Sequence, residues 1–164
     1  MSLSGHLDLE ARPLLRAALT TATGYALRAL AALPEDGSFC LAKDLAARLD
    51  IPGPYLAKIL QGLVQSDLLE SVRGPKGGFR LTRPAHRITV GEVVAALEGP
   101  DSLDGCIMGF PTCGGDHPCP LHEAWGAVKA QVATSMTQAT IRDLQLMDLR
   151  HLKEARERSG GPRT

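Results

Sequence analysis

The sequence has few aromatic residues, no net charge and no long apolar run. Aromatic residues make up 4% of the chain, whereas Leu (25 of 164 residues) and Ala (21), two strong helix formers, dominate. β-Rich folds prefer branched and aromatic side chains, so we expect a mainly α protein rather than a sandwich or barrel. No stretch approaches the ~20 apolar residues of a membrane span. The N-terminus also lacks the basic segment followed by an apolar segment that is typical of a signal peptide. We therefore expect a cytoplasmic protein with no membrane partner.

The absence of net charge hides a segregation of charged residues. The chain has 18 basic and 18 acidic residues. Residues 71–91 contain no acid, whereas residues 88–128 contain acids but no Lys or Arg. This asymmetry predicts a basic contact surface beside a segment with another role. The basic residues of the first segment are Arg73, Lys76, Arg80, Arg83 and Arg87.

Apolar periodicity and turn residues predict a helix-turn-helix followed by a hairpin. Helical spacing covers 20–33, 42–49 and 54–66, and the last two are joined by a tight Asp-Ile-Pro-Gly connection. Strands are predicted at 68–73 and 79–82, around a Gly-Pro-Lys-Gly-Gly loop. A helical pair alone is a weak signal. The basic hairpin after it makes the pattern typical of a winged helix-turn-helix.

Further helices are predicted on both sides of an irregular segment, 99–120. Thr89 and Glu92 form a capping box that starts a helix over 90–97. A long helix starts at Leu121, and a short one follows Thr140. We divide the chain into an N-terminal extension (1–18), a winged-helix domain (19–98), a metal-binding loop (99–120), dimerisation helices (121–149) and a flexible tail (150–164).

The segment 99–120 contains three of the four cysteines together with five Gly and four Pro. Cys106, Cys113 and Cys119 are followed by His122, and three thiolates with an imidazole suit zinc or an iron–sulfur centre. Their spacing matches neither common zinc knuckles nor ferredoxins, so spacing alone does not choose the metal. Cys40 lies between Phe39 and Leu41 and is predicted to be a buried core thiol.

Four segments together resemble the IscR/NsrR family of bacterial winged-helix regulators over about residues 19–147. They are GYALRAL from Gly24, SVRGPKGGFRL from Ser71, ITVGEV from Ile88, and CPLHEAW from Cys119. The resemblance implies that Cys106, Cys113 and Cys119 hold an iron–sulfur cluster and that a dimer binds operator DNA.

The resemblance also bears on the fourth ligand of the cluster. In the nitric-oxide-sensing branch a carboxylate near the first helix fills this role, but the matching position here is Gly24. His122 matches the ligand histidine of the IscR branch, so we favour a 2Fe-2S over a 4Fe-4S cluster, which an aerobic preparation can lack. His117 and Asp116 remain competing fourth ligands.

Two further surfaces follow from the predicted elements. The start of the third helix and the wing are expected to contact DNA through Pro54, Tyr55, Lys58, Arg73, Lys76 and Arg80. A core role for Tyr55 and a solvated basic hairpin are the plain alternatives. The long helix carries a seam of four-and-three spacing that is expected to pair with a second copy, or to pack within the chain. The seam consists of Trp125, Val128, Val132 and Met136.

The sequence thus predicts a homodimeric DNA-binding transcription regulator whose operator binding responds to the cluster. It is not expected to be an enzyme, because no catalytic constellation exists beyond the cysteines. The main alternative is a winged-helix interaction or DNA-binding module with a structural zinc site.

Overall fold

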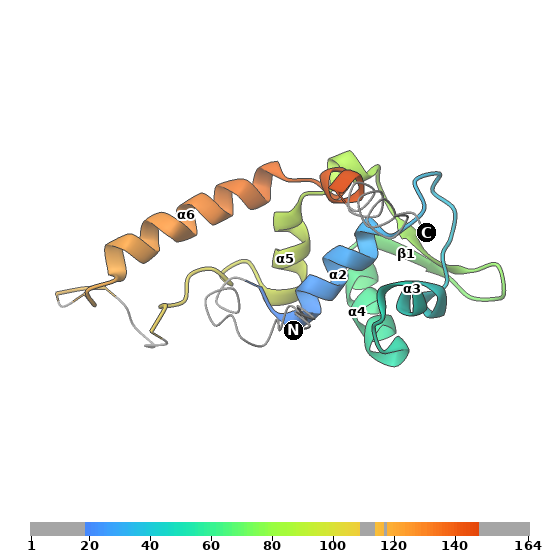
Figure 1. Ribbon diagram of the computed structural model, residues 1–164, viewed down its shortest axis with the longest axis horizontal. Coiled ribbons are helices and arrows are strands. Elements are labelled where there is room, and N and C mark those ends of the chain that lie inside the picture. Colours follow the sequence, from blue (N-terminus) through green and yellow to red (C-terminus); the bar gives the residue numbers. More distant parts are fainter. Residues whose placement is uncertain (1–18, 109–113, 117, 148–164) are drawn as a thin grey trace, which may run out of the picture.

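Helices make up most of residues 19–108, 114–116 and 118–147, the part of the chain that the computed structural model describes (Figure 1). A 3₁₀ helix, η2, which the sequence patterns did not predict, lies between the hairpin and α5. A further helical stretch covers 141–147. The named elements are α2 (Thr21–Ala31), α3 (Ala42–Leu49), α4 (Gly53–Gln65), β1 (Leu69–Val72), β2 (Gly78–Leu81), η2 (Ala85–Arg87), α5 (Val90–Glu98) and α6 (His122–Gln138).

Two arginines fix α2 against α3 by binding the carboxyl ends of these helices. The Arg28 guanidinium donates to the Leu49 carbonyl at 2.9 Å, and Arg48 donates to the Ala32 carbonyl at 3.1 Å. Carbonyl groups at helix ends lack intrahelical partners and attract cations. The two bonds therefore link the end of each helix to a side chain of the other.

The helix-turn-helix consists of α3 and α4, as predicted. Asp50 ends α3 in the left-handed conformation (φ 54°), and Pro54 lies in the first turn of α4, where a missing N–H costs little. The structure starts α4 at Gly53, one residue before the predicted range of 54–66, and Pro52 takes the N-cap position. The predicted inward face of α4 is confirmed, since Leu56, Ile59, Leu60 and Leu63 are buried.

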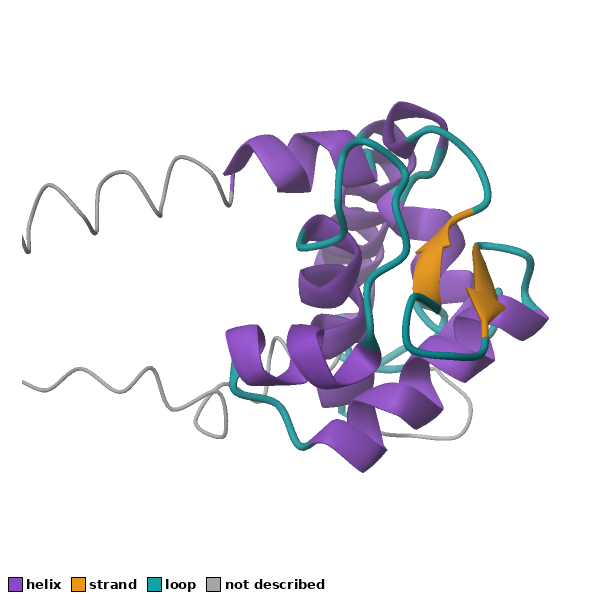
Figure 2. Cartoon of the chain, turned by 90° about the vertical axis from the view of Figure 1, so that its right-hand side faces the viewer, coloured by secondary structure: helices purple, strands orange, loops and turns teal. Residues whose placement is uncertain are grey.

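The hairpin is a two-stranded antiparallel sheet in which Leu69 pairs with Leu81 and Val72 with Gly78 (Figure 2). Its outer edge is extended by one residue of the α2–α3 loop, because Cys40 and Phe79 exchange backbone hydrogen bonds of 3.0 and 2.8 Å. Gly78 allows this approach, since a Cβ built there would lie 2.2 Å from the Cys40 carbonyl oxygen. The base of the wing is thus attached to the helical body.

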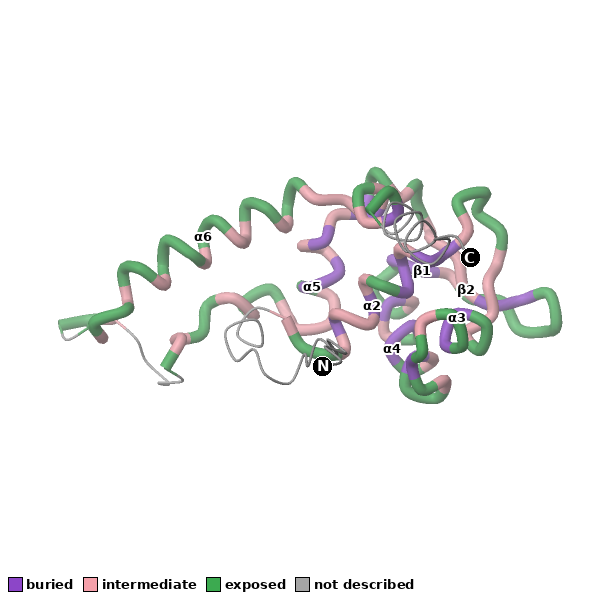
Figure 3. The backbone as a smooth tube through the Cα atoms, viewed as in Figure 1, coloured by how far each residue is buried: buried purple, intermediate pink, exposed green. Residues whose placement is uncertain are grey.

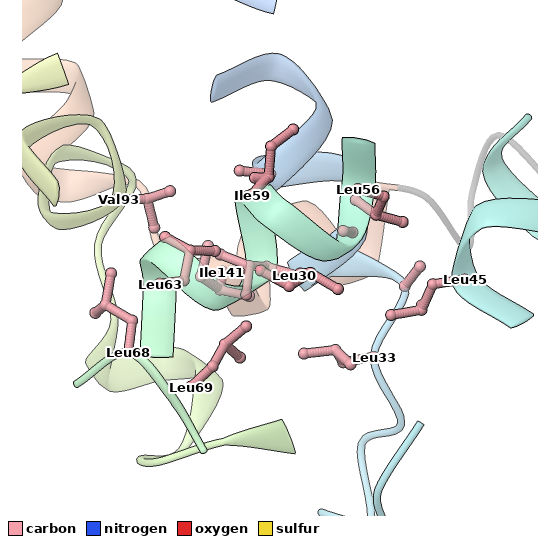
Figure 4. Packing of buried hydrophobic residues seen from close by; sticks show 14 of the residues in the cluster. Leu30, Leu33, Leu45, Leu56, Ile59, Leu63, Leu68, Leu69, Val93 and Ile141 are labelled. Carbon is pink, nitrogen blue, oxygen red and sulfur yellow. The ribbon is translucent and has the colours of Figure 1, made fainter. Parts of the chain in front are cut away.

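The core joins every part of the winged helix to the stretch 141–147. Side chains from α2, α3, α4, the wing base and α5 meet Ile141 in one cluster (Figure 4). The backbone of 139–141 is attached to the start of α5, because Val90 donates to the Ala139 carbonyl and Ile141 to the Ile88 carbonyl, both at 2.9 Å. The predicted capping box of Thr89 and Glu92 is present.

Helix α6 projects from this body, and none of its residues is buried (Figures 1 and 3). Within the described ranges, no helix is long and apolar enough to cross a membrane.

The prediction that Cys40 is a buried core thiol is wrong, because the residue is half-buried and packs against the core. The backbone of Cys40 lies at the sheet edge, which leaves one side of the residue open. The predicted extension 1–18 and tail 150–164 lie outside the described residues.

Candidate nucleic-acid interface and metal centre

The first turns of α4 present a polar and aromatic surface. Pro54, Tyr55 and Lys58 are all exposed. The Tyr55 ring meets the Tyr25 ring of α2 edge-on, with centroids 6.0 Å apart, and 42% of Tyr55 remains exposed. Arg28 lies 5.9 Å from the centre of the Tyr25 ring. Tyr55 is therefore neither a core aromatic nor an isolated surface residue, since α2 supports its ring while much of the residue remains accessible.

The wing carries two exposed cations at its turn. Arg73 and Lys76 lie between the strands, where the Gly77 N–H donates to the Gly74 carbonyl at 3.0 Å and closes the turn. The wing extends beyond α3 at the edge of the domain (Figure 1). Cations on such a projecting loop suit phosphate contacts or insertion into a narrow minor groove.

Arg80 differs from the other predicted DNA contacts because its guanidinium is engaged within the chain. Its Nε donates to Glu70 Oε1 on the paired strand, and its Cζ lies 4.5 Å from the centre of the Phe39 ring. These contacts stiffen the wing between β1 and the α2–α3 loop. A DNA contact by Arg80 stays a prediction.

The metal-centre residues gather around the start of α6. The His122 N–H donates to the Cys119 carbonyl at 3.0 Å, so Cys119 lies in the turn that leads into α6 and His122 is the first residue of the helix. A Cβ built on Gly114 would lie 3.3 Å from His122 Cε1, which places the imidazole against the residue that follows Cys113. Cys113 and His117 themselves lie outside the described residues.

Two side chains of α6 attach the Cys106 segment to the same helix. The Trp125 indole N–H donates to the Gly105 carbonyl at 2.9 Å, and Lys129 Nζ donates to the Asp104 carbonyl at 3.3 Å. Gly105 and Asp104 are the two residues before Cys106. The segments that carry Cys106, Gly114 and Cys119 therefore all connect to the first two turns of α6.

The donor chemistry of this region fits a soft metal centre. Cys119 and His122 lie where the positive end of the α6 dipole favours a thiolate. Among the described residues no group of three His, Cys, Asp or Glu side chains converges closely enough to hold an ion. The three predicted donors that the structure describes, Cys106, Cys119 and His122, are therefore not brought together as one ligand group, and Cys113 lies outside the described residues.

Cys40 has a different environment from the three loop cysteines. Burial raises the pKa of its thiol above the ordinary value of 9.0. Its Sγ lies 3.9 Å from the Leu41 carbonyl. The backbone of Cys40 pairs with Phe79, so Cys40 belongs to the base of the wing.

The predicted seam of α6 divides into two parts. Trp125, Val132 and Met136 are half-buried, and Met136 packs close to α5, since a Cβ on Gly91 would lie 3.4 Å from the Met136 carbonyl oxygen. Val128 is 48% exposed, and Leu121, one turn before Trp125, is 46% exposed. Contacts within the chain thus cover part of the seam, as expected if the seam packs within the chain. Val128 remains exposed and available to a second copy.

Sequence reasoning missed the residues that support these sites from a distance. Arg28, Tyr25 and Lys129 show no motif, and their partners lie in other elements. The only local signal was the cluster of Tyr25 and Arg28 in the segment that carries the family resemblance.

Comparisons with known proteins agree with this geometry. The model of the Rrf2 family, described as an iron-dependent transcriptional regulator, matches residues 19–146. The chain is 33% identical to the HTH-type transcriptional regulator IscR of Photobacterium profundum over 130 residues, which cover 77% of this chain and 74% of that protein.

Solved structures share the fold. CymR, the global cysteine regulator of B. subtilis, superposes with a TM-score of 0.66 at 24% identity, over 79% of this chain and 96% of that one. IscR of T. potens superposes with a TM-score of 0.61, also at 24% identity, over 89% and 93%. At this identity the likeness shows a common winged-helix architecture.

Proposed function

The chain belongs to the Rrf2 family of iron-dependent transcriptional regulators, and from this premise we propose that it binds operator DNA as a homodimer under the control of an iron–sulfur cluster. It is a transcriptional regulator with a DNA-binding fold and not an enzyme. The main support for DNA binding is that the start of α4 and the turn of the wing are both exposed. Lys58, Arg73 and Lys76 face solvent there.

The recognition surface works through two kinds of contact. The first turns of α4 enter the major groove, where Tyr55 and Lys58 reach base edges or nearby phosphates. The wing lies beside the duplex, where Arg73 enters a minor groove and Lys76 binds a phosphate. The Glu70–Arg80 pair joins the two strands of the wing, and the Cys40–Phe79 bridge attaches the wing to the α2–α3 loop. Rigid placement limits the ordering cost of binding.

The cluster would be held by Cys106, Cys113 and Cys119, with His122 as the fourth ligand and a 2Fe-2S centre favoured. Support comes from the attachment of Gly105, Gly114 and Cys119, which lie in or beside the ligand-bearing segments, to the start of α6. When bound, the cluster supplies a centre whose oxidation state and occupancy respond to oxidants and to iron supply. Trp125 and Lys129 keep the Cys106 segment near Cys119, which limits the entropy lost when the loop closes around a ligand.

Helix α6 links this region to the DNA-binding domain. Its far end is attached to α5 through residues 88–90 and 139–141. If two copies pair through α6, the arrangement of the 99–120 loop sets the angle between them and hence the distance between the two α4 helices. Two arrangements of the loop would shift the population of DNA-binding dimers.

The test is a DNA-binding measurement on anaerobically prepared protein, with iron, sulfide and zinc determined on the same sample. Random duplexes are selected on the protein, and the enriched sequence is titrated at several salt concentrations. Affinity should fall roughly a hundredfold or more between about 50 and 200 mM salt, because several phosphates are neutralised. A flat salt response contradicts DNA binding. A colourless protein with one zinc per chain supports the alternative of a structural zinc site.

Two variants separate recognition of the DNA sequence from phosphate binding. Arg73→Ala should weaken the selected sequence by about 1–3 kcal/mol and relax its specificity. Lys76→Ala should weaken all duplexes by a similar factor and reduce the salt dependence. If Arg73→Ala leaves the preference for the selected sequence unchanged, the wing does not read the operator.

A further inference from the structure

A pocket of about 610 Å³, lined by both charged and apolar residues, lies between the wing, the α2–α3 loop, η2 and the helical stretch 141–147. These segments come from distant parts of the sequence, and Figure 1 shows them beside one another at the end of the domain opposite the tip of α6. The volume falls in the range of small-molecule sites, roughly 300–1,000 Å³. The pocket includes no residue of α4 or of the metal centre at α6, and Arg80 is its one residue among the predicted DNA contacts.

Guanidinium and carboxylate groups line the pocket in equal numbers. The cations are Arg80, Arg83 and Arg142, and the carboxylates are Glu35, Asp36 and Glu70. Arg142 Nη1 lies 2.7 Å from Glu35 Oε2, which joins the last helix to the α2–α3 loop. Arg80 binds Glu70, whereas Arg83 binds Glu92 outside the pocket at 2.9 Å. A guanidinium has five N–H donors, so donors remain on each arginine beyond these single ion-pair contacts.

The lining of the pocket includes a buried amide side chain, that of Gln145. Gln145 is 4% exposed, and Thr23 is the only other buried polar or charged residue in the described part of the chain. Gln145 Oε1 accepts a hydrogen bond from Arg142 Nη1 at 3.5 Å. The Gln145 amide and the Arg142 guanidinium therefore lie side by side in the lining of the pocket.

The balance of charges determines which ligand fits. A simple anion would meet the three carboxylates, and a simple cation would meet the three guanidinium groups. A molecule with a carboxylate at one end and an ammonium group nearby satisfies both kinds of side chain. The Ser38 N–H donates to Asp36 at 2.9 Å and lowers the pKa of that carboxyl, so Asp36 stays charged as an acceptor for an ammonium group.

We propose that this pocket binds a small zwitterion of the free α-amino acid or short-peptide class. Its carboxylate contacts Arg142 beside Gln145, and its ammonium group contacts Asp36. Such a ligand would bridge β2 of the wing, the α2–α3 loop and the 141–147 helix, and would report the supply of amino-acid metabolites to the same elements that position the wing. Neither DNA nor a cluster is needed for binding.

The experiment titrates the full chain, free of DNA and metal, with each of the twenty L-amino acids and with triglycine by calorimetry. Acetate and methylammonium serve as the two halves of the ligand. At least one zwitterion should bind saturably, while neither half binds comparably. Arg142→Gln should weaken that zwitterion at least about tenfold by removing a charge-assisted contact, and Asp36→Asn should weaken it as well. Circular dichroism checks that both variants fold.

The matched control is Arg87→Gln, which removes an exposed arginine of η2 that does not line the pocket and should leave the affinity unchanged. The proposal is overturned if no zwitterion of the panel binds saturably, if acetate binds as tightly as the best zwitterion, or if Arg142→Gln keeps the original affinity. Because these titrations contain neither DNA nor metal, their outcome is independent of the regulatory function proposed above.

Discussion

At the scale of single residues, His122 has the most specific expected role. Its imidazole lies against Gly114, and its N–H binds the Cys119 carbonyl, so it contacts two of the segments that carry the predicted ligands. Each Cys→Ala change at Cys106, Cys113 or Cys119 should abolish the visible absorbance of the anaerobically reconstituted protein. His122→Ala should shift the absorption bands and shorten their lifetime, because an imidazole and its replacement donate differently to iron.

The matched variants for this prediction are His117→Ala and Asp116→Ala. Both residues belong to the same loop, so a general loosening of the loop would affect all three variants alike. A silent His122→Ala beside a shifted spectrum in one of the other two would assign the fourth ligand elsewhere.

Glu92 is the second residue with a measurable individual effect. The Thr89 backbone N–H, which donates to Glu92 at 2.8 Å, is the main cause that lowers the pKa of Glu92 below 4.5, and Arg83 adds to it. A carboxyl with a lowered pKa stabilises the fold above its unfolded-state pKa, and this stability is lost as the pH falls through the folded-state pKa.

We therefore expect Glu92→Ala to lower the free energy of unfolding by about 0.5–1 kcal/mol at neutral pH, as for other helix caps. The difference from the unmodified chain should shrink as the pH falls from about 4.5, the ordinary pKa of the unfolded carboxyl, through the lowered pKa of folded Glu92. Urea denaturation at neutral and acidic pH measures both values. Glu92→Gln is the control, because Gln keeps the hydrogen bond to Thr89 and loses only the charge. A difference that does not change with pH would mean that packing, and not the charge, is lost.

At the scale of elements, α6 acts as the support of the cysteine loop. Trp125 and Lys129 bind the two carbonyl groups that precede Cys106. Trp125→Phe retains the aromatic ring but removes the indole N–H. It should therefore speed hydrogen exchange of the amides around 104–106 in the metal-free protein and shorten the lifetime of the reconstituted absorbance.

Gln131→Met is a suitable control for this prediction. Gln131 is an exposed residue of the same helix, so its substitution should leave the rate of hydrogen exchange around 104–106 unchanged. If Trp125→Phe exchanges at the original rate, the hydrogen bond does not hold the loop, and the Cys106 segment is positioned by its own turns.

At the scale of the whole molecule, the exposed helix α6 either packs against a partner or remains in contact with solvent. A helix of 17 residues without a buried position gains little stability from its own chain, because most helices in proteins depend on tertiary packing. Val128 is 48% exposed and lies on the predicted seam. If two copies pair there, Val128→Asp places a charge in apolar surroundings. The variant should elute as a monomer in size-exclusion chromatography and lose affinity for the selected operator.

The same change on the opposite face of α6 provides the comparison. Ala130 is exposed, and Ala130→Asp adds an identical charge about 200° around the helix from Val128. It should leave the oligomeric state unchanged. Dimers of Val128→Asp with normal DNA affinity would show that the copies associate through another surface.

The elements themselves were predictable because their signals are local. Thr20 and the Thr89–Glu92 box start helices where side chains satisfy the first N–H groups. The run Leu56, Ile59, Leu60, Leu63 fixes the buried face of α4, and the glycines of the wing fix its turn. Each depends on residues a few positions apart, so the sequence alone determined the winged helix and the cysteine loop.

The tertiary structure decided which of these residues meet. Arg142 pairs with Glu35, Arg80 lies over Phe39, and Trp125 reaches back to Gly105. Such pairs depend on how whole elements pack around the core, and no short-range pattern encodes the distance between segments far apart in the chain. The same reason explains why the pocket beside the wing and the exposed Val128 became visible only in three dimensions, although every residue involved was already present in the sequence.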